Sequence, residues 1–113
     1  MSEFQSLRHT MSEAYADVQL CKEFNYATAK KLKLGYYAVK EASISKLKST
    51  KIADDVIYKC LQMLGGYGYV EDYPLARMYR DSRLGPIGGG TSEILKEIIS
   101  KMLIDNKSYN PKK

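Results

Sequence analysis

Apolar residues in the N-terminal third of the chain recur in steps of three and four, which is the period of an α-helix. This stripe consists of Phe4, Leu7, Met11, Ala14, Val18 and Cys21. No proline interrupts the run, and Gly35 supplies the residue type that commonly ends a helix. The pattern predicts a helix over residues 3–34, about 30 residues and roughly 45 Å long at 1.5 Å per residue.

The same period returns over residues 38–64 and predicts a second long helix. Its stripe consists of Val39, Ala42, Lys46, Ser49, Ala53, Val56, Cys60 and Met63. Lys46 and Ser49 break the apolar character, so this part of the helix is either loosely packed, solvated or packed against something polar. Gly65 and Gly66 then end the helix. Helices this long need packing partners, and we expect the two to run antiparallel.

Two shorter helices are predicted near residues 74–84 and 91–104. Pro74 follows the loop GGYGYVEDY and stands where a first helical residue is favoured. The loop GPIGGG, with four of the eight glycines, separates the two helices. The apolar residues expected to face inward from the last helix are Ile94, Leu95, Ile98, Ile99 and Met102. No β-pattern of useful length occurs, so the sequence predicts an all-α antiparallel bundle over residues 1–104. A polar tail, residues 105–113, is expected to fray.

Composition and charge narrow the classes of function. The 113 residues suffice for one domain. The net charge of +5 admits a nucleic-acid-binding module, whose affinity would fall steeply with salt. However, the lysines alternate with Glu and Asp along the helices, which favours a solvated face and no nucleic-acid partner. No apolar run approaches the roughly 20 residues of a membrane span. The start, MSEFQSLRHT, lacks a signal-peptide core, so we expect a cytoplasmic protein, or an organelle-matrix protein whose transit segment has been removed.

Few residues offer metal or nucleophile chemistry. His9 is the single histidine, and Cys21 and Cys60 sit among apolar neighbours at helical spacing. These cysteines are typical of small buried residues in a reducing compartment, so no metal site is predicted.

The segment GPIGGGTSEI is the strongest candidate for a binding site. Glycines that open a helix expose backbone N–H groups, and the helix dipole adds partial positive charge, so the pattern favours phosphate or another anion. The Thr91 hydroxyl could be an extra donor or a helix cap. A tight turn before a capped helix explains the same spacing equally well. The segment GGYGY follows a helix rather than a strand, so it is not a dinucleotide-binding fingerprint.

The run LQMLGGYGYVEDYPLARMYRDSRLGPIGGGTSEILKEII resembles the closing signature of acyl-CoA dehydrogenases. Gln-x-x-Gly-Gly-x-Gly-Tyr, Tyr-Pro-x-x-Arg-x-Tyr-Arg-Asp and Gly-Thr-x-Glu-Ile occur in the order and at the spacing of that family. The start, FQSLRHTMSEAYADV, resembles the long helix that precedes this signature. The resemblance thus covers nearly the whole chain but only about the last third of a full-length member. It implies an antiparallel helical bundle behind a flavin site.

The resemblance also implies two sets of cofactor contacts. The first set contacts the pyrophosphate and adenosine side of FAD and corresponds here to Gln62, Gly65 and Gly66. The second set lies near the flavin and the diphosphate and corresponds to Gly90, Thr91 and Glu93. In the family, loops of this region reach the FAD of a neighbouring subunit.

This sequence departs from the family pattern beside the second set. Many members carry a glutamate just before the Gly-Thr pair, the base that removes the substrate α-proton, but here the position is Gly89. Gly88 stands where an aromatic residue is common, which makes the loop unusually flexible. Some branches place the base on an earlier helix, which would lie upstream of Met1. An Arg-x-x-Phe-Gly segment and two further domains that shape the flavin pocket would lie upstream as well.

Two functions follow from the resemblance. The first is the C-terminal part of a flavin-dependent acyl-CoA dehydrogenase, with no catalytic base of its own and weak or absent FAD binding when isolated. Acyl-CoA substrate and an electron-transfer flavoprotein would be partners of the complete enzyme. The alternative is a non-catalytic helical oligomerisation module. Either reading implies a homo-oligomer, a dimer or tetramer, because apolar faces would otherwise meet water.

Overall fold

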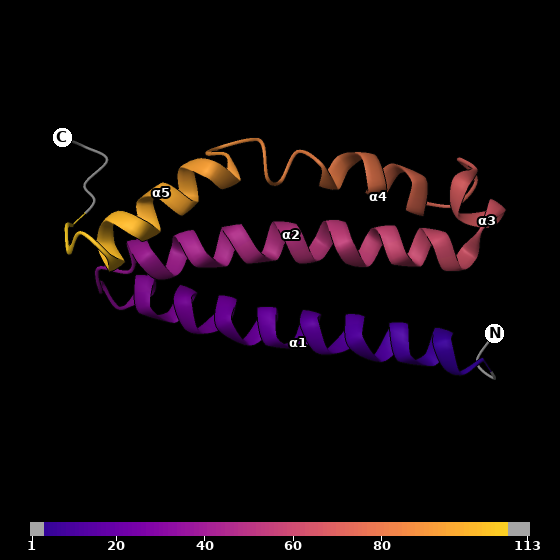
Figure 1. Cartoon of the computed structure of the whole chain (residues 1–113), viewed down its shortest axis with the longest axis horizontal. Helices are drawn as coiled ribbons and strands as arrows, with labels where there is room; N and C mark the ends of the chain where they lie inside the picture. Colours follow the sequence, from indigo (N-terminus) through magenta and orange to yellow (C-terminus); the bar gives the residue numbers. More distant parts are fainter. Residues whose placement is uncertain (1–3, 109–113) are drawn as a thin grey trace.

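The computed structural model describes residues 4–108 and contains, in that part of the chain, five helices and no strand (Figure 1). They are α1 (Gln5–Lys33), α2 (Val39–Leu64), α3 (Gly66–Tyr69), α4 (Leu75–Ser82) and α5 (Ser92–Leu103). The predicted all-α class is confirmed. The predicted position 3 and the last residues of the predicted tail lie outside the described residues.

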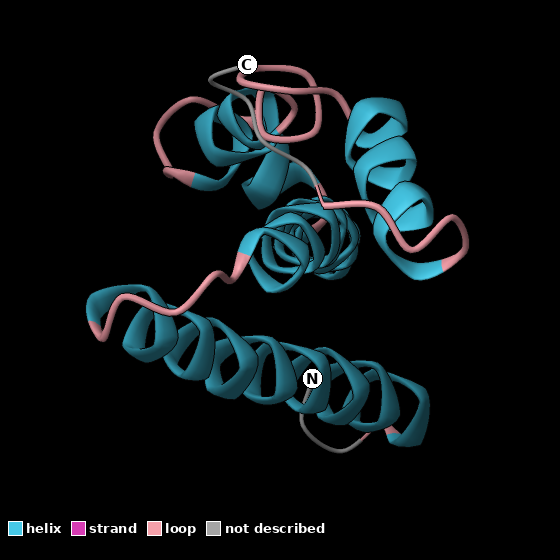
Figure 2. Ribbon diagram, turned by 90° about the vertical axis from the view of Figure 1, so that its left-hand side faces the viewer, coloured by secondary structure: helices cyan, strands magenta, loops and turns pink. Residues whose placement is uncertain are grey.

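Helix α2 lies in the middle of the molecule. It runs antiparallel to α1 on one side, while α4 and α5 lie along its other side (Figures 1 and 2). Helix α3 packs against the C-terminal end of α2 and against α4. The molecule measures 51 × 26 × 25 Å with a radius of gyration of 17.1 Å. A compact domain of this length would have a radius of gyration of about 13 Å, so the arrangement is elongated.

The ends of the two long helices agree with the predicted stop signals. Helix α1 ends at Lys33, and Gly35 follows with a left-handed φ of 85°. The Tyr36 amide bonds back to the Lys31 carbonyl at 3.1 Å, which satisfies one of the last carbonyls of α1. Gly65 ends α2 with a φ of 59°.

The loop predicted after α2 contains one helical turn, α3, which the sequence reading missed. After the turn at Gly65 the chain re-enters a helical path, and the Gly65 carbonyl accepts from the Gly68 amide at 3.0 Å. Gly68 packs so closely on α2 that a Cβ there would stand 3.0 Å from the Leu61 carbonyl oxygen. Two Gly–Tyr pairs carry too little apolar periodicity to predict a helix.

The polar positions in the middle of α2 pack against polar groups, which decides between the three possibilities that the sequence left open. Asn25 of α1 donates to Ser49 Oγ at 3.0 Å and accepts from Ser45 Oγ at 2.5 Å. The Cys21 sulfur lies 3.0 Å from the same Ser49 oxygen. These four side chains form a hydrogen-bonded layer between α1 and α2. The layer fixes how the two helices align, because sliding would leave half-buried polar groups unpaired.

The apolar core is thin. Only Ala14, Ala38 and Leu95 are buried apolar residues among those described. The predicted burial of the α1 stripe is wrong at Phe4, Met11 and Val18, whose side chains are 63%, 55% and 40% exposed. The physical reason is that α1 packs on α2 alone, so a single neighbour covers it.

The last helix agrees better with its predicted inward face. Leu95 is buried, and Ile98, Ile99 and Met102 are half-buried, whereas Ile94 is exposed and the prediction there is wrong. In the described part of the chain, none of the helices combines the length and apolar character that crossing a bilayer requires.

Candidate functional site

The glycine-rich loop before α5 ends in a capped helix N-terminus. Thr91 is the N-cap residue of α5, and its hydroxyl oxygen accepts from the Ile94 amide at 3.3 Å. The predicted cap is therefore confirmed. Gly89 and Gly90 precede it with φ angles of 66° and 109°. Residues that carry a side chain rarely adopt these positive φ angles, so the turn favours glycine at both positions.

Several backbone amides at this helix start have no acceptor within the part of the chain that the structure describes. They belong to Gly89, Gly90, Thr91 and Glu93. Consecutive N–H groups at the start of a helix, beside the positive end of its dipole, form a receptor for an anion such as phosphate. The arrangement therefore has the donors that the anion-binding reading of GPIGGGTSEI requires.

Lys46 of α2 forms hydrogen bonds to the backbone of this loop. Its side-chain ammonium donates to the Gly90 carbonyl at 2.5 Å and also to the Gly88 carbonyl. Lys46 is half-buried, and its Nζ lies 3.6 Å from where a Cβ of Gly89 would stand. The ammonium thus joins the two carbonyls on either side of Gly89 and adds a positive charge beneath the exposed amides.

Two further residues of α2 extend this anchoring. A Cβ at Gly85 would stand 2.9 Å from Thr50 Cγ2, so the chain passes directly over Thr50. Asp54 accepts from Ser82 Oγ at 2.9 Å and pairs with the Arg83 guanidinium at 2.6 Å. We call Lys46, Thr50 and Asp54 the anchor row. Residues four apart lie on one face of a helix, so this row supports the whole connection between α4 and α5.

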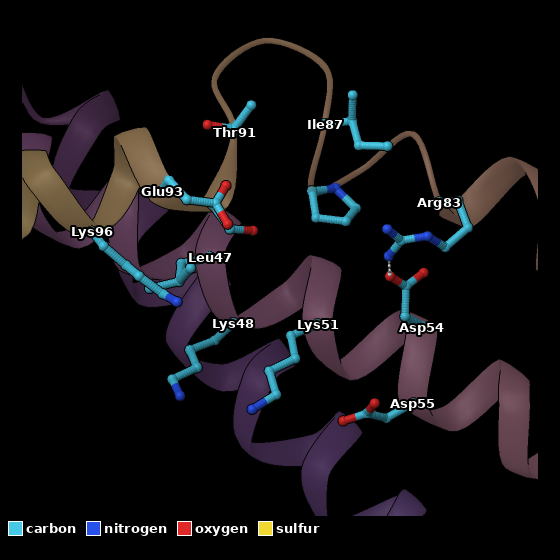
Figure 3. Close-up of a pocket in the computed structure, with 12 residues that line it drawn as sticks. Leu47, Lys48, Lys51, Asp54, Asp55, Arg83, Ile87, Thr91, Glu93 and Lys96 are labelled. Carbon is cyan, nitrogen blue, oxygen red and sulfur yellow. Dashed lines mark hydrogen bonds and ion pairs between the residues drawn. The ribbon is translucent and has the colours of Figure 1, made fainter.

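A cavity of about 540 Å³ opens beside the loop, between α2 and α5 (Figure 3). Thr91 and Glu93 line it together with Lys48 and Lys51 of α2 and Lys96 of α5. In Figure 3, Lys48 and Lys51 come from α2, whereas Lys96 and Glu93 come from α5. The lining also includes Arg83, Asp54 and Asp55, so four cationic side chains face three carboxylates. The structure therefore brings Thr91 and Glu93 to one cavity of mixed charge, with a single net positive charge among its lining residues.

The first predicted set of residues, Gln62, Gly65 and Gly66, lies at the C-terminal end of α2. Gln62 is exposed and lines a cavity of about 620 Å³, whose walls include Tyr58, Tyr69 and Tyr79. Gly65 and Gly66 are exposed at the α2–α3 junction, and neither has an atom within 4 Å of a Cβ built on it. The glycine backbone there is open to a ligand or to another protein surface.

Ion pairing and aromatic contacts stiffen the segment beside Gln62. Arg80 pairs with Glu71 at 2.7 Å, and this hydrogen bond and charge lower the pKa of the Glu71 carboxyl. Both side chains are largely exposed, so the pair contributes little to stability. Tyr67 and Tyr73 meet edge to face, with ring centroids 5.9 Å apart.

The two sets do not converge within one chain. Lys46, beneath Gly90, and Gln62 are both on α2, separated by sixteen positions. At 1.5 Å per residue this separation is roughly 24 Å along the helix axis. Gln62, Gly65 and Gly66 thus form one site and Gly90, Thr91 and Glu93 another. No group of three His, Cys, Asp or Glu side chains in the described region is arranged to hold a metal ion.

Sequence reasoning missed the cations of this site. It assigned the lysines to a solvated helix face, whereas Lys46 bonds to the loop and Lys48, Lys51 and Lys96 line a cavity. The signal that could have found Lys46 was its place on the apolar stripe of α2, because a lysine there must direct its ammonium to an acceptor. The lysines of the cavity come from two helices, and their convergence depends on tertiary packing.

Comparison with known proteins gives a consistent result. Residues 1–104 match the family profile "Acyl-CoA dehydrogenase, C-terminal domain". The mitochondrial long-chain specific acyl-CoA dehydrogenase of Sus scrofa is 31% identical over 107 residues, which cover 95% of this chain and 25% of that protein. The caffeyl-CoA reductase-Etf complex subunit CarC of Acetobacterium woodii is 33% identical over 104 residues, which cover 92% and 27%. The acyl-CoA dehydrogenase of Geobacillus kaustophilus superposes with a TM-score of 0.89 at 35% identity, covering 91% of this chain and 27% of that one.

The conformation of the loop yields a test with a matched control. We expect Gly90→Ala to lower the free energy of unfolding by about 1–2 kcal/mol, because its φ of 109° is strained for alanine. Gly66→Ala should leave stability unchanged or raise it by about 0.4–1 kcal/mol, because that position has a helical backbone and open space. Urea unfolding of both variants measures the difference. Equal effects would contradict the assigned loop conformation.

Proposed function

The chain belongs to the acyl-CoA dehydrogenase family as its C-terminal helical domain, and on that premise we propose that it supplies two cofactor-facing helix junctions to a flavin-dependent acyl-CoA dehydrogenase. The chain spans about a quarter of the length of the relatives it matches. The complete enzyme would dehydrogenate an acyl-CoA thioester between its α and β carbons, with FAD accepting the hydride. This domain would bind and orient the cofactor.

The observation that supports this proposal most strongly is the start of α5. Its exposed amides, the Lys46 charge beneath them and the adjacent cavity match the needs of a diphosphate. Gly90 and Thr91 would donate through their backbone N–H groups. Glu93 would contribute its backbone amide. Its carboxylate lies in the first turn of α5, where the positive end of the helix dipole stabilises a negative charge.

The junction at Gln62, Gly65 and Gly66 would contact the FAD of a neighbouring subunit. Gln62 lies roughly 24 Å along α2 from Lys46, which contacts the loop before α5, and this separation supports the assignment. The Gln62 amide offers both a donor and an acceptor, and the open glycine backbone permits close approach. One domain would thus serve two cofactors of an oligomer.

No residue of this chain is assigned as the catalytic base. Gly89 has no side chain to accept a proton, and its φ of 66° disfavours a larger residue. A side chain built at this position would place its Cβ 3.6 Å from Lys46 Nζ, so a glutamate there would stand beside a cation. We therefore propose that the base comes from residues other than these 113.

Electron transfer and location complete the proposal. The complete enzyme would pass electrons to an electron-transfer flavoprotein, in keeping with a relative named as a subunit of a reductase–Etf complex. The cytoplasmic location stays a prediction, and the relative from Sus scrofa is named as mitochondrial.

A second candidate function, a non-catalytic oligomerisation module, is favoured by one observation. Leu20 and Leu34 are 73% and 64% exposed, and Phe24 is 38% exposed, all on or just after α1. Helix α1 packs only on α2 among the described helices. A second copy, or another domain, would remove these side chains from water.

Flavin binding by the isolated chain tests the expectation that this domain alone cannot hold the cofactor. We expect the purified 113-residue chain to be colourless and inactive on acyl-CoA with an artificial electron acceptor, because the helix junctions alone give few contacts to FAD. Absorbance of the gel-filtered protein in the flavin bands measures this. A yellow protein would contradict the expected weak binding.

A chimaera with the missing domains tests whether this domain supports flavin binding in a complete enzyme. Residues 1–104 would replace the matching segment of the Geobacillus kaustophilus enzyme, with which they share 35% identity. The chimaera should retain FAD, and Thr91→Val should weaken retention because the cap and the amide geometry are lost. Thr10→Val, on exposed α1, is the control and should change nothing. A chimaera that folds without flavin would favour the oligomerisation module.

We also expect the chain to self-associate as a dimer or tetramer. Each large apolar side chain left in water forfeits on the order of 1.5–3 kcal/mol, so several together outweigh repulsion from a net charge of +5 at physiological salt. Sedimentation at micromolar concentration provides the measurement. A single species near 12.8 kDa would contradict the expectation.

A further inference from the structure

We propose that Lys46 is the positioning residue of the loop before α5, holding the exposed amides of Gly89, Gly90 and Thr91 in the shape that receives the cofactor. The inference rests on the proposed function for what the loop binds. The role assigned to Lys46 is a property of the ligand-free chain and can be measured there.

The geometry sets Lys46 apart from the other lysines near the site. Its ammonium bonds to two carbonyls that flank a single residue, Gly89. In a trans peptide unit the N–H points opposite to the C=O, so the Gly89 and Thr91 amides, which share peptide units with the two bonded carbonyls, point away from the ammonium. This geometry accounts for the Gly89 and Thr91 N–H groups, which have no acceptor in the described part of the chain.

The loop needs such a restraint because of its composition. Three consecutive glycines, Gly88 to Gly90, have more backbone freedom than any other tripeptide. The protein hydrogen bonds next to them are at the two ends of the loop, from Gly88 to Leu84 at 2.7 Å and from Ser92 to Pro86 at 3.2 Å. Lys46 acts between these ends. Charge-assisted bonds are about twice as strong as neutral ones, which suits them to this task.

Lys46 also has an unused donor. An ammonium carries three N–H groups, and two of them serve Gly88 and Gly90. The positive charge of the Lys46 ammonium is not neutralised by a carboxylate, because Lys46 forms no ion pair within residues 4–108. The same group would therefore shape the loop and add attraction for an anion above it.

A merely structural role for Lys46 would predict a different result from a positioning role. If the side chain only contributed packing, Lys46→Met would preserve most of its effect, because methionine is similarly long and unbranched. If the ammonium positions the loop, methionine should release the loop selectively, and Lys46→Arg should restore much of the effect through its own N–H donors.

Amide hydrogen exchange, followed residue by residue by NMR on the full chain without ligand, separates these outcomes. In Lys46→Met we expect the Ser92 and Ile94 amides to exchange about tenfold faster or more, the change expected from losing one charged hydrogen bond. Lys46→Arg should exchange more slowly than Lys46→Met. The Ala42 amide, bonded to Ala38 within the helical hairpin, is the internal reference and should change little.

Lys59→Met is the matched control, because Lys59 is also half-buried on α2 but makes no hydrogen bond to the loop. Unchanged exchange at Ser92 and Ile94 in Lys46→Met would overturn the proposal. So would equal acceleration in every helix, which would make Lys46 a general stabilising residue. Failure of arginine to do better than methionine would also overturn it.

Flavin retention by the chimaera distinguishes failure of this inference from failure of the proposed function. With Lys46→Met in the chimaera, FAD affinity should fall about tenfold while the fold persists. A chimaera that binds no FAD even with Lys46 contradicts the proposed function, whereas the exchange experiment judges the role of Lys46 separately. Full FAD affinity in the Lys46→Met chimaera would overturn the inference.

Discussion

The arrangement of this domain depends on the packing of α2 against its neighbours. Among the described helices, α1 and α5 each contact only α2, whereas α4 contacts both α2 and α3. Helix α2 is therefore the one described helix that contacts all the others. Its Asn25-facing side carries the polar layer with α1, and its anchor row carries the connection between α4 and α5. The two helix junctions keep their spacing because both are attached to this one rigid element.

Much of the specificity of this packing is polar. Few side chains are fully buried, whereas hydrogen bonds from Asn25, Lys46 and Asp54 define which surfaces meet. Apolar contacts tolerate sliding more readily than hydrogen bonds between specific atoms do. The elongated shape and the exposed leucines of α1 leave apolar faces open, which other domains or subunits would cover under the proposed function. A rigid hydrogen-bonded frame with open apolar faces is well suited to that position.

The sequence predicted those features that depend on neighbouring residues in the chain, and it did not predict those that depend on contacts between helices. Helices, their stops at Gly35 and Gly65 and the cap at Thr91 depend on residues within about one turn, so local patterns identified them. The polar partners of Lys46 and Ser49 lie on other helices, and the sequence could indicate only that the stripe was broken. The exposure of Phe4 and Met11 followed from the absence of a second neighbour for α1, which periodicity cannot reveal. The candidate cofactor residues came from the family resemblance, and the cavity lysines beside them came from the fold.

The central claim is that α2 is the common support of the domain, and the ranking of local stabilities tests it most directly. Native-state hydrogen exchange at increasing urea would give the opening free energy of each helix. The account predicts that α2 amides open only with global unfolding, while α1 and α5 open at lower and mutually independent free energies. If α1 or α5 instead remained protected after α2 had opened, the claim would be contradicted.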